Sequence, residues 1–76
     1  MRGVAVSVDE IGKTVRSTRR SLGVTQRELA MAAGTGLRFV IDLEKGKPTC
    51  QLGKTLAVLS TLGVEVAFAG RVPRGV

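Results

Sequence analysis

Residues 25–47, TQRELAMAAGTGLRFVIDLEKGK, contain two short helical patterns separated by a glycine-bearing corner. Thr25 precedes Glu28 by three residues, the spacing of a capping box, so a helix is expected to begin here. One face of this helix is apolar and carries Leu29, Ala30 and Ala33. Small Ala30 lets a second helix cross closely, and Gly34 supplies the left-handed residue that ends the first helix.

The second helical pattern begins at Leu37 and stops at Gly46. Val40 and Leu43 repeat at helical spacing, and Lys45 lies in the last turn, where a cation interacts favourably with the helix dipole. Two short helices joined by a tight turn predict a helix-turn-helix unit that presents its second helix to DNA.

This stretch resembles the XRE (lambda-repressor-like) helix-turn-helix family. The matching motifs are Thr25-Gln26, Glu28-Leu29-Ala30, Gly34 and Leu43-Glu44-Lys45-Gly46-Lys47. The resemblance extends upstream through the first expected helix, residues 7–22. It implies a mainly α fold: a four- to five-helix lambda-repressor-like domain with a short C-terminal β-strand that pairs across a homodimer.

Further motifs resemble the HipB-type antitoxin branch of the family. They are Gly46-Lys47-Pro48-Thr49, the run LGKTLAVL at residues 52–59, and Leu62-Gly63-Val64-Glu65-Val66. This resemblance implies a homodimeric repressor that autoregulates its operon and binds a HipA-like kinase toxin. Two alternatives stay open. One is a free-standing XRE regulator of the phage-repressor or restriction-modification-controller type, and the other is a toxin-neutralising interaction module that does not bind DNA.

The charge balance favours a polyanionic partner, because 12 Lys and Arg against 6 Asp and Glu give a net charge of +6. Aromatic residues make up only 3%, which leaves few rings on which single-stranded bases could stack, so double-stranded DNA is favoured. The 76 residues are expected to form one domain, with a structured core at 7–69 and a flexible basic tail at 70–76. So small a domain buries only about 60% of its unfolded-chain surface, and dimerisation would stabilise it.

No segment predicts export or membrane insertion, because the apolar runs are too short for a signal peptide or a bilayer span. A cytoplasmic protein is expected, and lone Cys50 is interpreted as a packing residue.

Enzymatic chemistry is not expected. With no His and one Cys, the chain lacks the residues of an ordinary catalytic triad or a zinc site, so no metal or cofactor is predicted. Gly53-Lys54-Thr55 has the ending of a P-loop, but Pro48 stands where that motif needs its first glycine. Gly34-Thr35-Gly36 lacks the third glycine of a dinucleotide fingerprint.

The first helix is expected over residues 7–22, because Ser7 and Glu10 form a second capping box. Its inward face carries Val8, Ile11, Val15 and Leu22. Three basic residues point outward: Lys13, Arg16 and Arg20. Arg19 lies on the inward side, where an unpaired charge is costly. The resemblance to lambda-type repressors implies a buried ion pair between Arg19 and Glu44.

The last helix is expected to begin after Thr49 as its cap and to end at Gly63. Its predicted inner face carries Leu52, Leu56, Leu59 and Leu62.

Residues 64–69 alternate with period two and predict a strand with Val64, Val66 and Phe68 on one side. Inside the chain only the β-leaning residues 3–6 could pair with it, and the pattern of 1–6 does not decide between an edge strand and a disordered arm. We therefore expect the strand to pair antiparallel with its symmetry mate, which makes Val64, Val66 and Phe68 dimer-interface residues.

The XRE resemblance also implies the residues that touch DNA, which come from the start of the second helix and the exposed face of the third. They are Gln26, Gly36, Leu37, Arg38 and Asp42, with Lys45, Lys47 and Thr49 near phosphates. An arginine at the exposed start of a recognition helix can bind guanine O6 and N7, so Arg38 is the leading base-contact candidate.

Three positions depart from the family pattern. Gly36 stands where the family usually has a capping Ser or Thr, so this cap is weaker. Leu37 and Ile41 are apolar where polar side chains are common. Leu37 suits a thymine methyl, whereas Ile41 is expected to pack against a neighbour.

Overall fold

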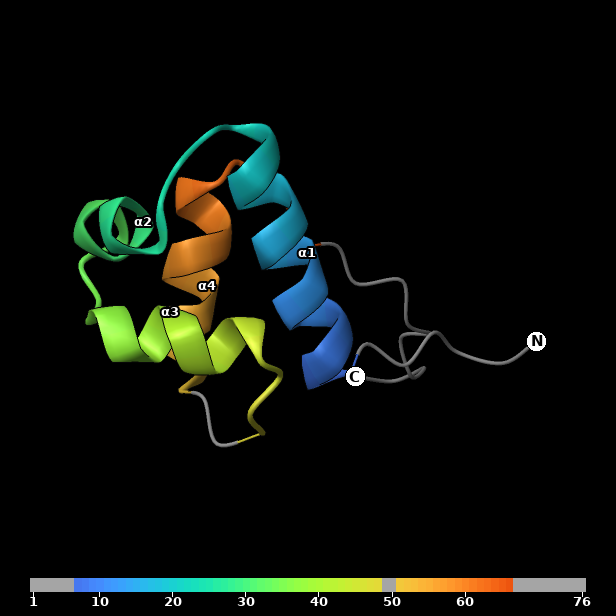
Figure 1. Ribbon diagram of the computed structural model, residues 1–76. Helices are drawn as coiled ribbons and strands as arrows, with labels where there is room; N and C mark the ends of the chain where they lie inside the picture. Colours follow the sequence, from blue (N-terminus) through green and yellow to red (C-terminus); the bar gives the residue numbers. More distant parts are fainter. Residues whose placement is uncertain (1–6, 49–50, 67–76) are drawn as a thin grey trace, which may run out of the picture.

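The computed structural model describes residues 7–48 and 51–66, and the chain within these ranges folds into a bundle of four helices (Figure 1). The helices are α1 (Val8–Ser21), α2 (Gln26–Ala33), α3 (Leu37–Glu44) and α4 (Leu52–Thr61). The helix α3 packs against both α1 and α2, and α2 also packs against α4. The mainly helical fold expected from the sequence is confirmed.

Both predicted capping boxes are present. At the start of α1, Ser7 Oγ accepts from the Glu10 backbone N–H at 3.1 Å, and the Glu10 carboxylate accepts from the Ser7 N–H at 3.3 Å. Thr25 and Glu28 make the same reciprocal bonds at the start of α2. These bonds satisfy backbone donors that have no partner inside a helix, and they fix where each helix begins.

The core is aliphatic and draws on all four helices. Its completely or almost completely buried side chains are Val15, Leu29, Ala30, Val40, Leu43, Val58, Leu59 and Leu62. At about 25 cal/mol for each Å² of apolar surface removed from water, this burial is the main stabilising term of the fold. It holds α3 in place while leaving the opposite side of that helix open to solvent.

The predicted inner face of α4 is partly wrong. Leu59 and Leu62 are buried as expected, but Leu52 is 71% exposed and Leu56 is 42% exposed. Thr55 and Val58 lie inside instead. The helix begins at Leu52 after Gln51 rather than after Thr49, so the predicted cap is wrong as well.

The inward face of α1 also differs from the prediction. Val15 is fully buried, and Ile11 packs against the core, but Leu22 follows the end of the helix and is 57% exposed. Gly12, which the prediction did not include, is buried on the inward face of α1. The outward positions of Lys13, Arg16 and Arg20 agree with the prediction.

The predicted C-terminal strand falls only partly within the described residues. Val64 packs against the core, and residues 64–66 show no strand pairing within the described chain. Residues 67–69, including Phe68, lie outside the described ranges, as do residues 1–6, Thr49, Cys50 and the 70–76 tail.

Candidate nucleic-acid interface

The corner between α2 and α3 is built by local hydrogen bonds. Gly34 ends α2 in the left-handed region, with φ 72° and ψ 29°, and the Thr35 N–H donates to the Ala30 carbonyl at 2.9 Å. A side chain at Gly34 would strain this conformation, whereas glycine adopts it freely. Only residues 34–36 separate the two helices, so α3 follows α2 as a tight helix-turn-helix.

The cap at the start of α2 is also electrostatic. The Thr25 backbone N–H donates to the Glu28 carboxylate at 2.9 Å and is the largest influence that lowers the pKa of Glu28 below its ordinary value, and the Thr25 side chain lowers it further. A carboxylate in the first turn also interacts favourably with the positive end of the helix dipole. The start of α2 is therefore most stable when Glu28 is ionised.

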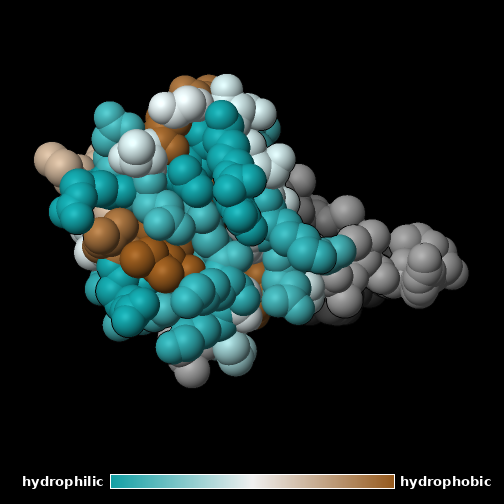
Figure 2. Space-filling view, viewed as in Figure 1, coloured by the Kyte–Doolittle hydropathy of each residue, from teal (hydrophilic) through white to brown (hydrophobic). Residues whose placement is uncertain are grey.

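The outward face of α3 has three parts. Val40 and Leu43 point into the core, and at 3.6 residues per turn Arg38 and Lys45 lie on the opposite side of the helix, where both are exposed. Ile41 lies on one flank of this outward line, and Asp42 lies on the other. Figure 2 shows a hydrophobic patch over α3 among hydrophilic side chains.

Asp42 forms two weak ion pairs on this face. Its carboxylate lies 3.9 Å from Arg38 Nη1 and 3.9 Å from Lys47 Nζ. The Asp42 side chain is 23% exposed, whereas those of Arg38 and Lys47 are 75% and 59% exposed. Ion pairs this open to solvent are worth little energy, so both cations are free to turn toward an anionic ligand.

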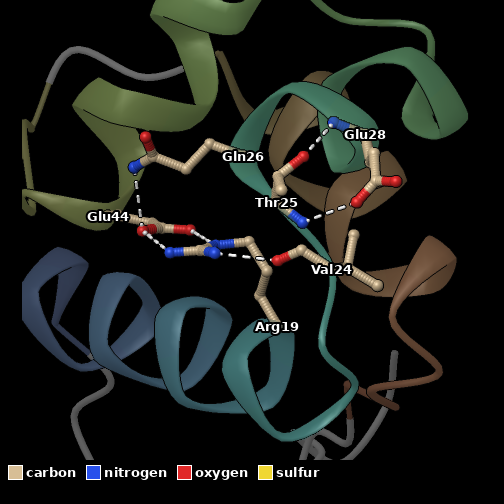
Figure 3. Close-up of polar contacts among 6 residues, drawn as sticks. All are labelled: Arg19, Val24, Thr25, Gln26, Glu28 and Glu44. Carbon is tan, nitrogen blue, oxygen red and sulfur yellow. Dashed lines mark hydrogen bonds and ion pairs between the residues drawn. The ribbon is translucent and has the colours of Figure 1, made fainter.

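The expected ion pair between Arg19 and Glu44 is present and ties α1 to the end of α3 (Figure 3). Arg19 Nε and one terminal nitrogen donate to the two Glu44 oxygens at 2.6 and 3.1 Å. The other terminal nitrogen donates to the Val24 carbonyl at 2.8 Å, and Gln26 Nε2 donates to Glu44 at 3.1 Å. The Arg19 and Glu44 side chains are only 12% and 4% exposed.

This network has a clear electrostatic cause and consequence. The hydrogen bond to Glu44 is the largest influence on Arg19 and raises its pKa, burial acts in the opposite direction, and the charge of Glu44 raises the pKa further. Since each member of the pair satisfies the other, neither is a stranded buried charge. The network joins α1, the start of α2 and the end of α3, and so fixes the orientation of α3.

The predicted DNA-contact residues within the described chain lie at the start of α2, along α3 and just after the end of α3. Gly36, Leu37, Arg38 and Asp42 lie at or within the first turns of α3, and Lys45 and Lys47 follow its end. Gln26 begins α2, but its amide nitrogen donates to Glu44, so it also supports the buried network. Gly36 precedes α3 with extended backbone and has no side chain with which to cap it. Thr49 lies outside the described residues.

One cation near this face was missed by sequence reasoning. Lys54 of α4 places its Nζ 5.9 Å from the centre of the Phe39 ring of α3. A cation at this distance is attracted by the face of an aromatic ring. The available signal was the position of Lys54 in the first turn of the helix that follows the Lys45–Lys47 segment.

The predicted dimer residues border an open depression of about 490 Å³. Its lining residues are Leu56, Leu59, Ser60, Gly63, Val64, Glu65 and Val66. Val66 is 46% exposed, and Phe68 lies outside the described residues.

Neither a metal centre nor a membrane span is found in the part of the chain that the structure describes. Over residues 7–48 and 51–66, the acidic side chains form no cluster of metal-ligating type. None of the helices in these ranges has the length and apolar character needed to cross a bilayer.

No family model matches the chain, but one curated protein and several solved structures resemble it. The HTH-type transcriptional regulator y4mF of Sinorhizobium fredii (strain NBRC 101917 / NGR234) is 54% identical over 57 residues, which cover 75% of each protein. The chain also superimposes on HipB in two solved structures. For the HipA-HipB-O2-O3 complex, the TM-score is 0.79 at 19% identity. For the HipB-O4 20mer complex, it is 0.78 at 19% identity. Each match covers 91% of this chain and 97% of the other. The chain therefore has the fold of these HipB structures, and it belongs to the family of HTH-type transcriptional regulators.

Proposed function

We propose that this chain is a transcriptional repressor that reads double-stranded DNA with the outward face of α3. The observation that carries the proposal is the placement of Arg38, the second residue of α3, with its side chain 75% exposed and directed away from the core. A guanidinium group can donate two hydrogen bonds to guanine O6 and N7 in the major groove.

Charge around α3 supports the same proposal. Lys45 and Lys47 follow the helix and are both exposed, and the chain carries a net charge of +6. Lysines in such positions neutralise phosphates and supply affinity that is independent of sequence, whereas Arg38 supplies selectivity.

The comparisons support it independently. The y4mF relative is an HTH-type transcriptional regulator, and the fold resembles that of HipB in complexes with an O4 20mer and an O2 20mer. The resemblance in sequence and the resemblance in fold thus agree on the same class of regulator.

The active form is proposed to be a homodimer in which residues 64–69 pair antiparallel with the same residues of a second copy. Exposed apolar side chains support this: Leu56 and Val66 border the depression beside α4. An isologous contact of this kind is self-complementary, and it would place two α3 helices on half-sites about 34 Å apart.

We further propose that the chain is an antitoxin that binds a HipA-like kinase and represses its own operon. Its fold resembles HipB in the HipA-HipB-O2-O3 complex, which is what supports a partner of this type. The free-standing regulator and the interaction module without DNA binding are the competing functions.

DNA binding is tested first, with the full chain and the duplex that lies upstream of its own gene. Fluorescence anisotropy should show tighter binding to this duplex than to a scrambled duplex of equal length and composition. Equal affinity for both would contradict a sequence-specific repressor.

Dimerisation is tested by sedimentation of two variants, one truncated after Gly63 and the other Phe68→Asp. Both should lose the dimer and bind the upstream duplex more weakly. The matched control is Leu22→Asp, which puts a carboxylate on an exposed apolar position at the end of α1. If both interface variants stay dimeric with unchanged DNA affinity, the contact lies elsewhere.

The neighbouring gene and copurification separate the remaining functions. A neighbouring HipA-like kinase that copurifies with the chain supports the antitoxin. DNA binding without such a kinase supports a free-standing regulator, and kinase binding without DNA binding supports the interaction module.

A further inference from the structure

Leu37 and Ile41 form an apolar flank on the proposed DNA-reading helix. They lie four residues apart, so they are neighbours on the surface of α3. Both are partly exposed, and neither belongs to the partly buried side chains that pack against the core in the described chain. Ile41 was expected to pack against a neighbour, but it is not among the side chains that pack against the core of the described chain.

Cations border this apolar flank. Arg38 and Lys45 lie along the outward line of α3, and Ile41 lies directly beside that line. The hydrophobic patch over α3 is surrounded by hydrophilic side chains in Figure 2. The occupant that fits both features is a polyanion that presents small apolar groups close to the helix.

The DNA major groove presents such groups as the 5-methyl groups of thymine. Leu37 and Ile41 have no side-chain donor or acceptor, so contact with a methyl group is the base-specific interaction open to them. An apolar protein surface is a weaker fit, because docking it here would remove the exposed cations Arg38 and Lys45 from water and supply no new anion to pair with them.

We propose that Leu37 and Ile41 read 5-methyl groups of pyrimidines, so that each preferred half-site carries thymine next to the base pair contacted by Arg38. This inference rests on the proposed function and adds to it the class of base that α3 selects. It assigns selectivity for thymine to the flank and selectivity for guanine to Arg38.

The test uses the full chain and a 40-base-pair duplex selected by it from a random-sequence library. The duplex is synthesised with thymine and again with uracil at single positions, which removes one methyl group and keeps every hydrogen-bonding group. At one or more thymines of each half-site, the uracil duplex should bind about fourfold more weakly, as expected for one apolar carbon removed from contact.

Variants assign the effect to the flank. Leu37→Ala and Ile41→Ala should each bring the ratio of affinities for the thymine and uracil duplexes close to one, and each variant should do so at a different position of the half-site. Leu22→Ala, at an exposed apolar residue at the end of α1, is the matched control and should keep the wild-type ratio. The wild-type comparison is decisive even if one variant fails to fold.

Each outcome decides the proposal. Equal wild-type affinity for thymine and uracil duplexes at every position would overturn it while leaving DNA recognition intact. A ratio that persists unchanged in both flank variants would also overturn it, because another group must then sense the methyl. If the library yields no selected sequence, the proposed function fails together with this inference.

Discussion

Gly12 of α1 lies directly against the carbonyl oxygen of Leu43 in α3, where the Cβ of any other residue would overlap that oxygen. The same Cβ would lie 3.1 Å from the Glu44 carbonyl oxygen. This close approach of α1 to the end of α3 accompanies the ion pair that Arg19 makes with Glu44, about two turns farther along α1. The orientation of α3 therefore depends on a residue without a side chain.

Gly12→Ala should lower the free energy of unfolding by about 1–3 kcal/mol, because the obstructing atoms are backbone and cannot rotate away. Alanine stabilises a helix by up to about 1 kcal/mol relative to glycine, so the measured loss is the cost of the clash minus this gain in helix propensity. Gly53→Ala is the control, since no described atom lies within 4 Å of a Cβ there, and it should stabilise the chain. Urea denaturation at fixed protein concentration measures both, and an unchanged midpoint for Gly12→Ala would contradict the close approach.

Arg19→Met should lower the free energy of unfolding by about 3–5 kcal/mol, because it leaves the Glu44 carboxylate buried without its partner. Replacing both residues, Arg19→Met with Glu44→Leu, should recover most of the loss, since no buried charge remains. The exposed neighbour provides the control, and Arg20→Met should change stability by no more than about 0.5 kcal/mol. The pairing is refuted if Arg19→Met melts at the wild-type temperature.

Glu28→Gln should make the chain less sensitive to acid. Because the Thr25 bonds lower the folded pKa of Glu28 below its ordinary value of 4.5, ionised Glu28 stabilises the fold above that value. This contribution is lost as the pH falls through the folded pKa. Melting curves between neutral pH and about pH 3 should therefore show a larger fall for wild type than for the variant. Parallel pH profiles would mean that Glu28 does not contribute in this way.

DNA binding should weaken steeply with salt, with a log–log slope of about −0.9 for each phosphate contact. Lys47→Ala and Lys45→Ala should each reduce the magnitude of that slope by about one, with similar effects on all sequences. Arg20→Ala, on the outward side of α1, should leave the slope unchanged. Anisotropy titrations at several salt concentrations measure it, and a wild-type slope near zero would exclude phosphate binding.

The corner between α2 and α3 was predictable because its signals are local. The capping box of Thr25 and Glu28, the left-handed Gly34 and the end of α3 before Gly46 each depend on residues within one or two helical turns. The pairing of Arg19 with Glu44 is a long-range contact, and it was predicted from the family resemblance rather than from spacing.

The inward face of α4 was not predictable from periodicity. The apolar residues of this helix form a stripe that is wider than its buried face, so the pattern does not select which part of the stripe faces the core. Thr55 is tolerated inside because its hydroxyl donates to the Gln51 carbonyl at 2.9 Å and is not left unsatisfied. The surplus apolar residues, Leu52 and Leu56, remain exposed, and Leu56 also lines the depression beside the proposed dimer residues.

The role of Gly12 was also not predictable from the sequence. A glycine inside a helix disfavours that helix on local grounds, and its benefit appears only once α1 and α3 are packed together. Likewise, the placement of Lys54 over Phe39 depends on how α4 crosses α3.

The most direct test of DNA recognition by α3 is the affinity of Arg38→Ala for two duplexes, the preferred site and a random sequence of equal length. We expect a loss of about 1–3 kcal/mol on the preferred site and little change on random DNA, because a base contact is lost while most of the charge remains. Arg20→Ala serves as the matched control for removing one exposed arginine. An equal loss on both duplexes, or no loss on either, would contradict base recognition by Arg38.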